Sequence, residues 1–100
     1  MRRDVLTLEG VNINNIIKKF VNYFNPSGKF TDKTGTINVF IIEKYYFRAE
    51  SILTSMVIFE QKNQNTLIIH LVVSGGGLSI FSGNAKKSLL KKLKKFFLEH

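Results

Sequence analysis

Two groups of residues near the end of the chain have types and spacing that can bind an anion. The first is Ser74-Gly75-Gly76-Gly77, whose backbone N–H groups can approach a phosphate, with Lys86 and Lys87 following in a predicted helix. The sequence contains no GxxxxGK[ST] motif, and Gly75–Ile80 does not fit GxGxxG. Glycines also occur where a chain leaves a strand sharply, because they allow positive φ and close backbone approach. A phosphate site and a purely structural turn are therefore both possible.

The second group is the run of lysines in that predicted helix. Residues 84–97 contain six lysines and no acid, and the cationic surface continues through Lys91, Lys92, Lys94 and Lys95. The whole chain has 15 basic and seven acidic residues, a net charge of +8. Such a surface can attract nucleic acid or an anionic membrane. It can equally be a solvated face that keeps a small domain soluble, and the sequence leaves these interpretations open.

Residues suited to catalysis or metal binding show no recognisable pattern. The chain has no cysteine, which excludes disulfides, thiolate nucleophiles and cysteine-based metal sites. His70 stands alone in an apolar segment, and we interpret it as a structural or interface residue. The acids are scattered, so no carboxylate pair is indicated. We therefore favour a non-enzymatic role and predict no catalytic residue, metal site or cofactor.

A further cluster, Glu43-Lys44-Tyr45-Tyr46-Phe47-Arg48, sets aromatic beside basic residues on a predicted strand. Such neighbours can stack on the bases of single-stranded nucleic acid. The RNP-type pattern is absent, however, and strand aromatics more often lie in a core or a subunit interface.

The elements that position these residues follow from hydrophobic periodicity. Apolar residues at helical spacing, after Asn12 as N-cap, predict a helix over 12–24. β-Branched and aromatic residues predict a short edge strand at 5–8 and longer strands at 36–48, 52–61 and 66–73. Short polar connections make the three longer strands an antiparallel meander.

Two segments have less regular patterns. Lys29–Gly35 is expected to be a polar connection with a little extended structure around Phe30. Leu78–Phe81 is expected to be a strand stub or a segment that seats the last helix. In that helix Leu89, Leu93 and neighbouring apolar residues form one stripe, which we expect to pack on the sheet with the lysines outward.

The predicted strands are apolar on both faces, whereas two helices cover only one face of a sheet comfortably. The pattern predicts an α+β domain with an antiparallel sheet of three to four strands and two helices packed on one face. The order is β-α-β-β-β-(β)-α. We expect the second face to meet another copy in a homodimer, or to fold around a pocket.

The succession of a helix, the EKYYFR strand end (Glu43 to Arg48), two strands and the SGGG turn (Ser74 to Gly77) before a C-terminal helix resembles a family of small uncharacterised bacterial proteins. The resemblance covers about residues 5–97 and implies a domain of unknown function with no assigned site residue. That family tends to carry a Trp-Gly-Ala-Glu-like stretch after the glycines. Here Ser82–Lys86 has no tryptophan and a lysine in place of the acid, which puts any role of that glutamate in doubt.

The chain is expected to form one domain over 1–97, because no linker or repeat interrupts it. Leu98-Glu99-His100 resembles the start of a polyhistidine tag. No signal peptide or transmembrane run is evident, so a cytoplasmic location is expected. Three functions remain: a self-associating or binding domain, a phosphate or anionic small-ligand binder at Gly75–Gly77, and a nucleic-acid or membrane-surface binder through Lys86–Lys95.

Overall fold

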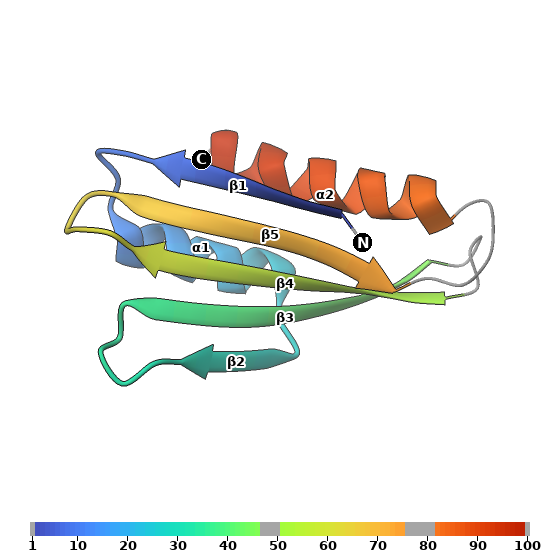
Figure 1. Cartoon of the computed structure of the whole chain (residues 1–100), viewed down its shortest axis with the longest axis horizontal. Coiled ribbons are helices and arrows are strands. Elements are labelled where there is room, and N and C mark those ends of the chain that lie inside the picture. The colour runs from blue at the N-terminus through green and yellow to red at the C-terminus, as the bar shows by residue number, and fades with distance from the viewer. Residues whose placement is uncertain (1, 47–50, 76–81, 100) are drawn as a thin grey trace.

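The computed structural model describes residues 2–46, 51–75 and 82–99. Within these residues the chain forms five strands and two helices in the order β-α-β-β-β-β-α (Figure 1). The elements are β1 (Arg2–Leu8), α1 (Ile13–Phe24), β2 (Gly28–Thr31), β3 (Ile37–Tyr46), β4 (Ser51–Gln61), β5 (Leu67–Gly75) and α2 (Ser82–Leu98).

The strands form one sheet in the order β1-β5-β4-β3-β2, and every neighbouring pair is antiparallel. The predicted meander is confirmed, because β3, β4 and β5 lie side by side in chain order. The predicted edge strand is also confirmed: β1 pairs with β5, with Val5 opposite His70 and Leu8 opposite Leu67. Both helices lie against the same face of this sheet (Figure 1).

The sheet has five strands where the sequence predicted three to four, and the addition is β2, in the segment expected to be a polar connection. It pairs with β3, placing Phe30 opposite Val39. The turn between them is built around Asp32, whose carboxylate accepts hydrogen bonds from the Ile37 N–H at 3.1 Å and the Thr34 hydroxyl at 2.6 Å. Side-chain bonds of this kind hold a short hairpin that has too few apolar residues for a periodic signal.

Helix α1 begins and ends where its capping residues require. The Asn12 side chain accepts a hydrogen bond from the Asn15 N–H, as an N-cap does. Asn25 adopts a left-handed conformation with φ 49° and donates its N–H to the Val21 carbonyl, which ends the helix. The predicted helix over 12–24 is thereby confirmed.

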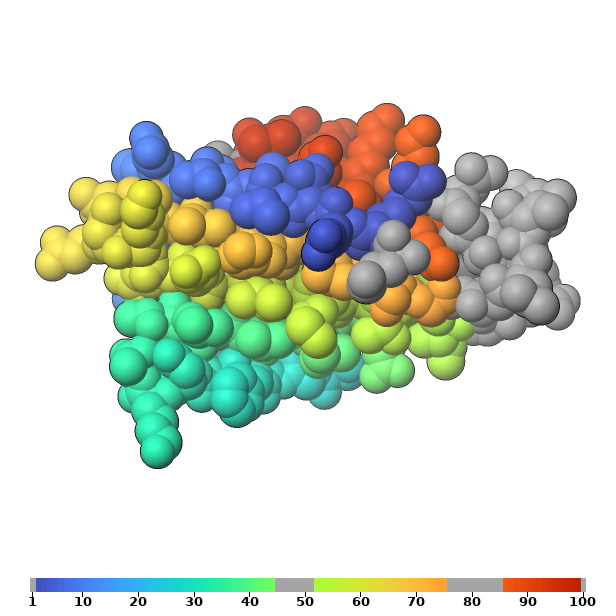
Figure 2. Space-filling view, in the orientation of Figure 1, coloured from blue at the N-terminus to red at the C-terminus, as the bar shows by residue number. Residues whose placement is uncertain are grey.

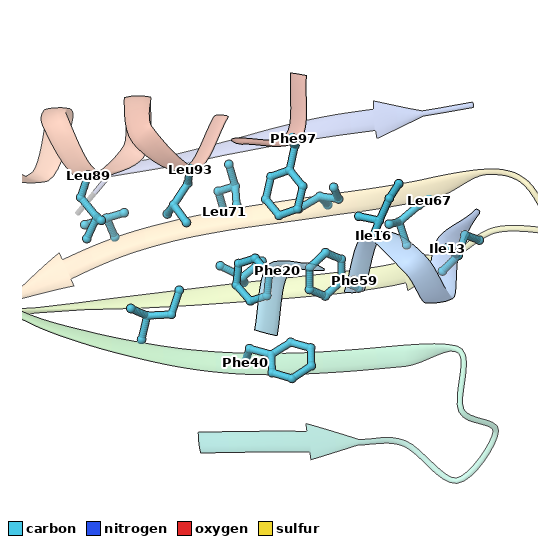
Figure 3. Close-up of a cluster of buried hydrophobic side chains, with 14 of the residues drawn as sticks. Ile13, Ile16, Phe20, Phe40, Phe59, Leu67, Leu71, Leu89, Leu93 and Phe97 are labelled. Atoms are coloured by element: carbon cyan, nitrogen blue, oxygen red, sulfur yellow. The ribbon is translucent and has the colours of Figure 1, made fainter. Parts of the chain in front are cut away.

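The core lies between the sheet and the two helices (Figure 3). Alternate residues of β5 and β4 face it, and Leu89, Leu93 and Phe97 of α2 close it from the other side. Phe20 of α1 is fully buried, and its ring centroid lies 5.2 Å from that of Phe59 and 5.6 Å from that of Phe97. This aromatic centre fixes both helices on the sheet, so their outer surfaces are held rigidly side by side.

Three parts of the prediction lie outside the described residues: the strand end at Phe47 and Arg48, the glycines Gly76 and Gly77, and the Leu78–Phe81 segment.

Candidate binding surfaces

One face of the sheet carries the helices, and the other, the open sheet face, has no helix over it (Figure 2). Strand register places ten apolar residues on the open sheet face, all exposed or half-buried: Val5, Phe30, Ile37, Val39, Ile41, Ile52, Met56, Ile58, Ile68 and Val72. Met56 stands near the centre, between Ile41 of β3 and Val72 of β5.

Large exposed hydrophobic side chains concentrate on this face. Among the described residues there are seven of them, and five lie on the open sheet face: Val5, Phe30, Ile37, Ile52 and Met56. Phe30 is 64% exposed and Met56 is 38% exposed. Such a concentration of exposed apolar side chains is uncommon on the surface of a monomeric protein.

The two glutamates of the open sheet face, Glu60 and Glu43, have partners within the same molecule. His70 Nε2 lies 3.0 Å from Glu60 Oε1, so the histidine that stands alone in the sequence has an acidic partner on the neighbouring strand. Glu43 accepts a hydrogen bond from the Ser27 hydroxyl at 3.2 Å. The structural or interface role of His70 stays a prediction.

The opposite surface of the molecule is cationic. Together α1 and α2 contain eight lysines and no Asp or Glu, and we call these lysines the cationic helix face: Lys18, Lys19, Lys86, Lys87, Lys91, Lys92, Lys94 and Lys95. Their side chains are exposed or half-buried. The expected outward direction of the α2 lysines is therefore correct.

One lysine of this face pairs with a strand. The Lys94 Nζ lies 2.7 Å from Asp4 Oδ2 of β1. The hydrogen bond from Lys94 and a second one from the Val5 N–H lower the pKa of the Asp4 carboxyl below its ordinary value. Lys94 is thus partly committed to holding α2 on β1, whereas the sequence placed it only on a solvent-facing cationic surface.

A groove runs between α2 and the start of β1. It has a volume of about 630 Å³, and Arg2, Lys87, Lys91 and Lys94 rim it around Leu90, with Lys95, Leu98 and Glu99 completing the wall. The structure therefore gathers four of the six predicted site lysines around one groove. Lys86 and Lys92 are not part of this lining.

The glycine turn is described only at its start. Ser74 is half-buried at the end of β5, opposite Thr54, and Gly75 follows with φ +92°. A Cβ at Gly75 would stand 2.8 Å from the Ile52 carbonyl oxygen, so the backbone of β5 approaches β4 too closely for a side chain. This supplies a structural reason for Gly75, while the anion site at Gly75–Gly77 with Lys86 and Lys87 stays a prediction.

The two charged residues that begin the cluster at 43–48 lie on opposite faces of β3. Glu43 lies on the open sheet face, and Lys44 lies on the helix side of β3. Phe47 and Arg48 are outside the described residues.

Three residues that the sequence analysis did not single out lie at these surfaces: Arg2 joins the groove at α2, and Lys19 and Tyr23 of α1 line a second pocket. Lys44, which the sequence analysis placed in the 43–48 cluster, approaches Lys92. One signal was available in the sequence: α1, like α2, has lysines and no acid on its polar face.

Among the described residues, no three His, Asp or Glu side chains gather as metal ligands do. None of the described helices has the length and apolar character that a membrane crossing requires. No family model, curated protein or solved structure matches this chain.

Proposed function

We propose that this chain is a self-associating domain in which two copies pack together through the open sheet face. The observation that carries the proposal is the concentration of exposed apolar side chains there, five of the seven among the described residues. Packing a second copy on the face removes this surface from water, which is the main driving force for association.

The size of the face fits a dimer interface. Five strands about 4.8 Å apart and roughly 25 Å long make a surface on the order of 600 Å². Two such faces bury about 1,200 Å² in total, the lower end of the range for specific interfaces. Face-to-face packing of two antiparallel sheets is a common solution, and a twofold axis makes the same patch serve both copies.

The polar groups of the face are compatible with burial. Because Glu60 and His70 already contact each other at 3.0 Å, a second copy does not leave either group without a hydrogen-bond partner. Arg3 lies on the edge strand β1, where it can stay in water.

Sedimentation equilibrium on the full chain tests the proposal. We expect a monomer–dimer equilibrium in the micromolar range, and Met56→Lys should shift it to monomer because it places a charge at the centre of the apolar patch. Gln64→Lys adds the same charge in the exposed β4–β5 turn and should dimerise as the wild type does. A wild-type monomer at high micromolar concentration, or a Met56→Lys dimer of unchanged affinity, contradicts the proposal.

A second candidate function is polyanion binding through the cationic helix face. The observation that favours it is the absence of any carboxylate from two neighbouring helices that carry eight lysines. A dimer formed through the open sheet face leaves both helix layers outside, so the two functions do not compete for one surface. Binding to an oligonucleotide or an anionic vesicle that weakens steeply with salt supports this candidate, and no binding at low salt rejects it.

A further inference from the structure

A pocket opens where the ends of α1 and α2 lie side by side. It has a volume of about 460 Å³, and its lining is Lys19 and Tyr23 of α1 with Lys92, Lys95 and Phe96 of α2 and the adjoining Glu99. We call it the Tyr23 pocket. It combines an aromatic surface with three lysines, and it lies on the cationic helix face.

Tyr23 is held in position and is nevertheless accessible. Its ring stacks on Phe96 at a centroid distance of 5.3 Å and an angle of 30°, and it meets Phe24 edge-on at 4.9 Å. Even so, Tyr23 is 61% exposed, which is unusual for a ring with two aromatic neighbours. A rigid ring with an accessible surface can stack on another planar group at little entropic cost.

Lys92 brings positive charge to the Tyr23 ring and has a second lysine nearby. Lys92 Nζ lies 5.9 Å from the centre of the Tyr23 ring, and Lys92 also approaches Lys44 of β3. Burial and then the neighbouring charge of Lys92 lower the pKa of the Lys44 ammonium. The Tyr23 pocket therefore lies beside concentrated positive charge, which attracts an anion.

The surface extends well beyond one phosphate. Helix α2 has 17 residues and is therefore about 25 Å long, with lysines from Lys86 to Lys95 along it. A mononucleotide is long enough to fill only the pocket. A strand of several nucleotides is long enough to reach the other lysines of α2 as well. Duplexes keep their bases stacked inside, so only a single strand offers a base to Tyr23.

We propose that the Tyr23 pocket binds single-stranded nucleic acid, with one base stacked on Tyr23 and the adjoining phosphates contacting Lys19, Lys92 and Lys95. The proposal rests on the polyanion-binding function of the cationic helix face and names its ligand. It is independent of dimer formation through the open sheet face.

Fluorescence anisotropy with a labelled oligothymidylate of about a dozen nucleotides tests the proposal, because base–aromatic stacking is sequence-tolerant. Tyr23→Leu should weaken binding by roughly five- to a hundred-fold, the range expected for losing one stacked base. Tyr23→Phe keeps the stacking surface and should bind as the wild type does. Circular dichroism and thermal unfolding check that each variant is folded, which the exposure of Tyr23 favours.

Lysine variants separate the pocket from the general charge. Lys92→Gln should weaken binding and reduce the slope of log affinity against log salt by about 0.7, as expected for one lost phosphate contact on a single strand. Lys33→Gln removes the same charge in the exposed β2–β3 turn and should have little effect. Glu99→Gln should strengthen binding, because it removes the carboxylate from the pocket lining.

A duplex of equal length and vesicles of anionic phospholipid serve as competing probes. Weaker binding to both than to the single strand supports the proposal. Unchanged binding by Tyr23→Leu contradicts the proposal that a base stacks in the Tyr23 pocket, and leaves the proposed polyanion binding intact. The absence of oligonucleotide binding at low salt overturns the pocket, and if the vesicles are not bound either, it overturns polyanion binding as well.

Discussion

The Lys94 ammonium donates a hydrogen bond to the Asp4 carboxylate over 2.7 Å and so joins the last helix of the chain to its first strand. Asp4 is paired with Leu71 across β1 and β5 and lies on the helix side of the sheet. The other described strand residues on that side are mostly apolar. The contact therefore marks the position at which α2 is aligned along β1.

Acidification should weaken this contact. Hydrogen bonds from Lys94 and the Val5 N–H hold the pKa of Asp4 below its ordinary value of 3.8. A carboxyl whose pKa is lower in the folded state stabilises the fold above its unfolded pKa, and this contribution is lost as the pH falls through the folded pKa. Urea unfolding at pH values from about 7 down to 2 should show a steeper acid loss of stability for the wild type than for Asp4→Asn.

The comparison needs a check that the effect comes from the pair. Lys94→Gln should reduce the loss of stability at acid pH by a similar amount. The double variant should differ little from either single variant, because each change removes the same contact. Equal acid sensitivity in the wild type and Asp4→Asn contradicts the assignment.

Phe20 should be the most costly aromatic residue to truncate. Its ring is fully buried and lies within 6.2 Å, centroid to centroid, of five other phenylalanine rings. Phe20→Ala should lower the free energy of unfolding by about 3–5 kcal/mol. Phe30→Ala, measured at a concentration where the protein is monomeric, should change it by about 0.5 kcal/mol or less, because Phe30 is 64% exposed.

Gly75 should not tolerate a side chain, and Gly10 offers a matched control. Both have positive φ, +92° and +68°, but a Cβ at Gly10 meets no atom within 4 Å, whereas one at Gly75 lies 2.8 Å from the Ile52 oxygen. Gly10→Ala should cost about 1 kcal/mol for the left-handed backbone alone, and Gly75→Ala roughly 2–4 kcal/mol.

Thermal unfolding of the wild type and of Gly75→Ala also tests the anion site predicted at Gly75–Gly77. Thermal shifts with a panel of nucleotides and sugar phosphates should rise with ligand concentration if the turn binds them. If Gly75→Ala lowers the Tm and no ligand shifts the wild type, Gly75 acts only in the turn.

Ser55 is a polar residue in an apolar environment. It is fully buried on β4, and its hydroxyl has no hydrogen-bond partner among the described residues. Ser55→Ala should raise the free energy of unfolding by about 1 kcal/mol, since it removes a desolvated hydroxyl at almost no loss of volume. A loss of stability in urea unfolding indicates instead that the hydroxyl is bonded in the folded protein.

The strong periodic signals predicted the fold well. The stripe from Ile13 to Phe24, the N-cap at Asn12 and the apolar run of β5 each follow from local sequence. β2 was missed because the Asp32 turn and backbone pairing hold it, and neither leaves a periodic apolar pattern.

The candidate sites were harder to predict because they combine distant elements. The lysines of α2 were evident, but Tyr23 becomes a site residue only when α1 and α2 lie side by side. Likewise, Glu60 and His70 meet through the register of β4 and β5, which their positions in the chain do not reveal. The apolar residues on both faces of the predicted strands correctly indicated that the sheet face without helices is apolar.

The position of β1 beside β5 also has a consequence for synthesis in the cell. β1 leaves the ribosome long before β5, its one neighbour among the described strands, and before α2, which packs against it. β1 therefore cannot form its place in the sheet until β5 has been made, and this pairing is a late, non-local step of folding. The charged residues at its start, Arg2, Arg3 and Asp4, are of the kind that disfavours pairing of an exposed strand with another chain.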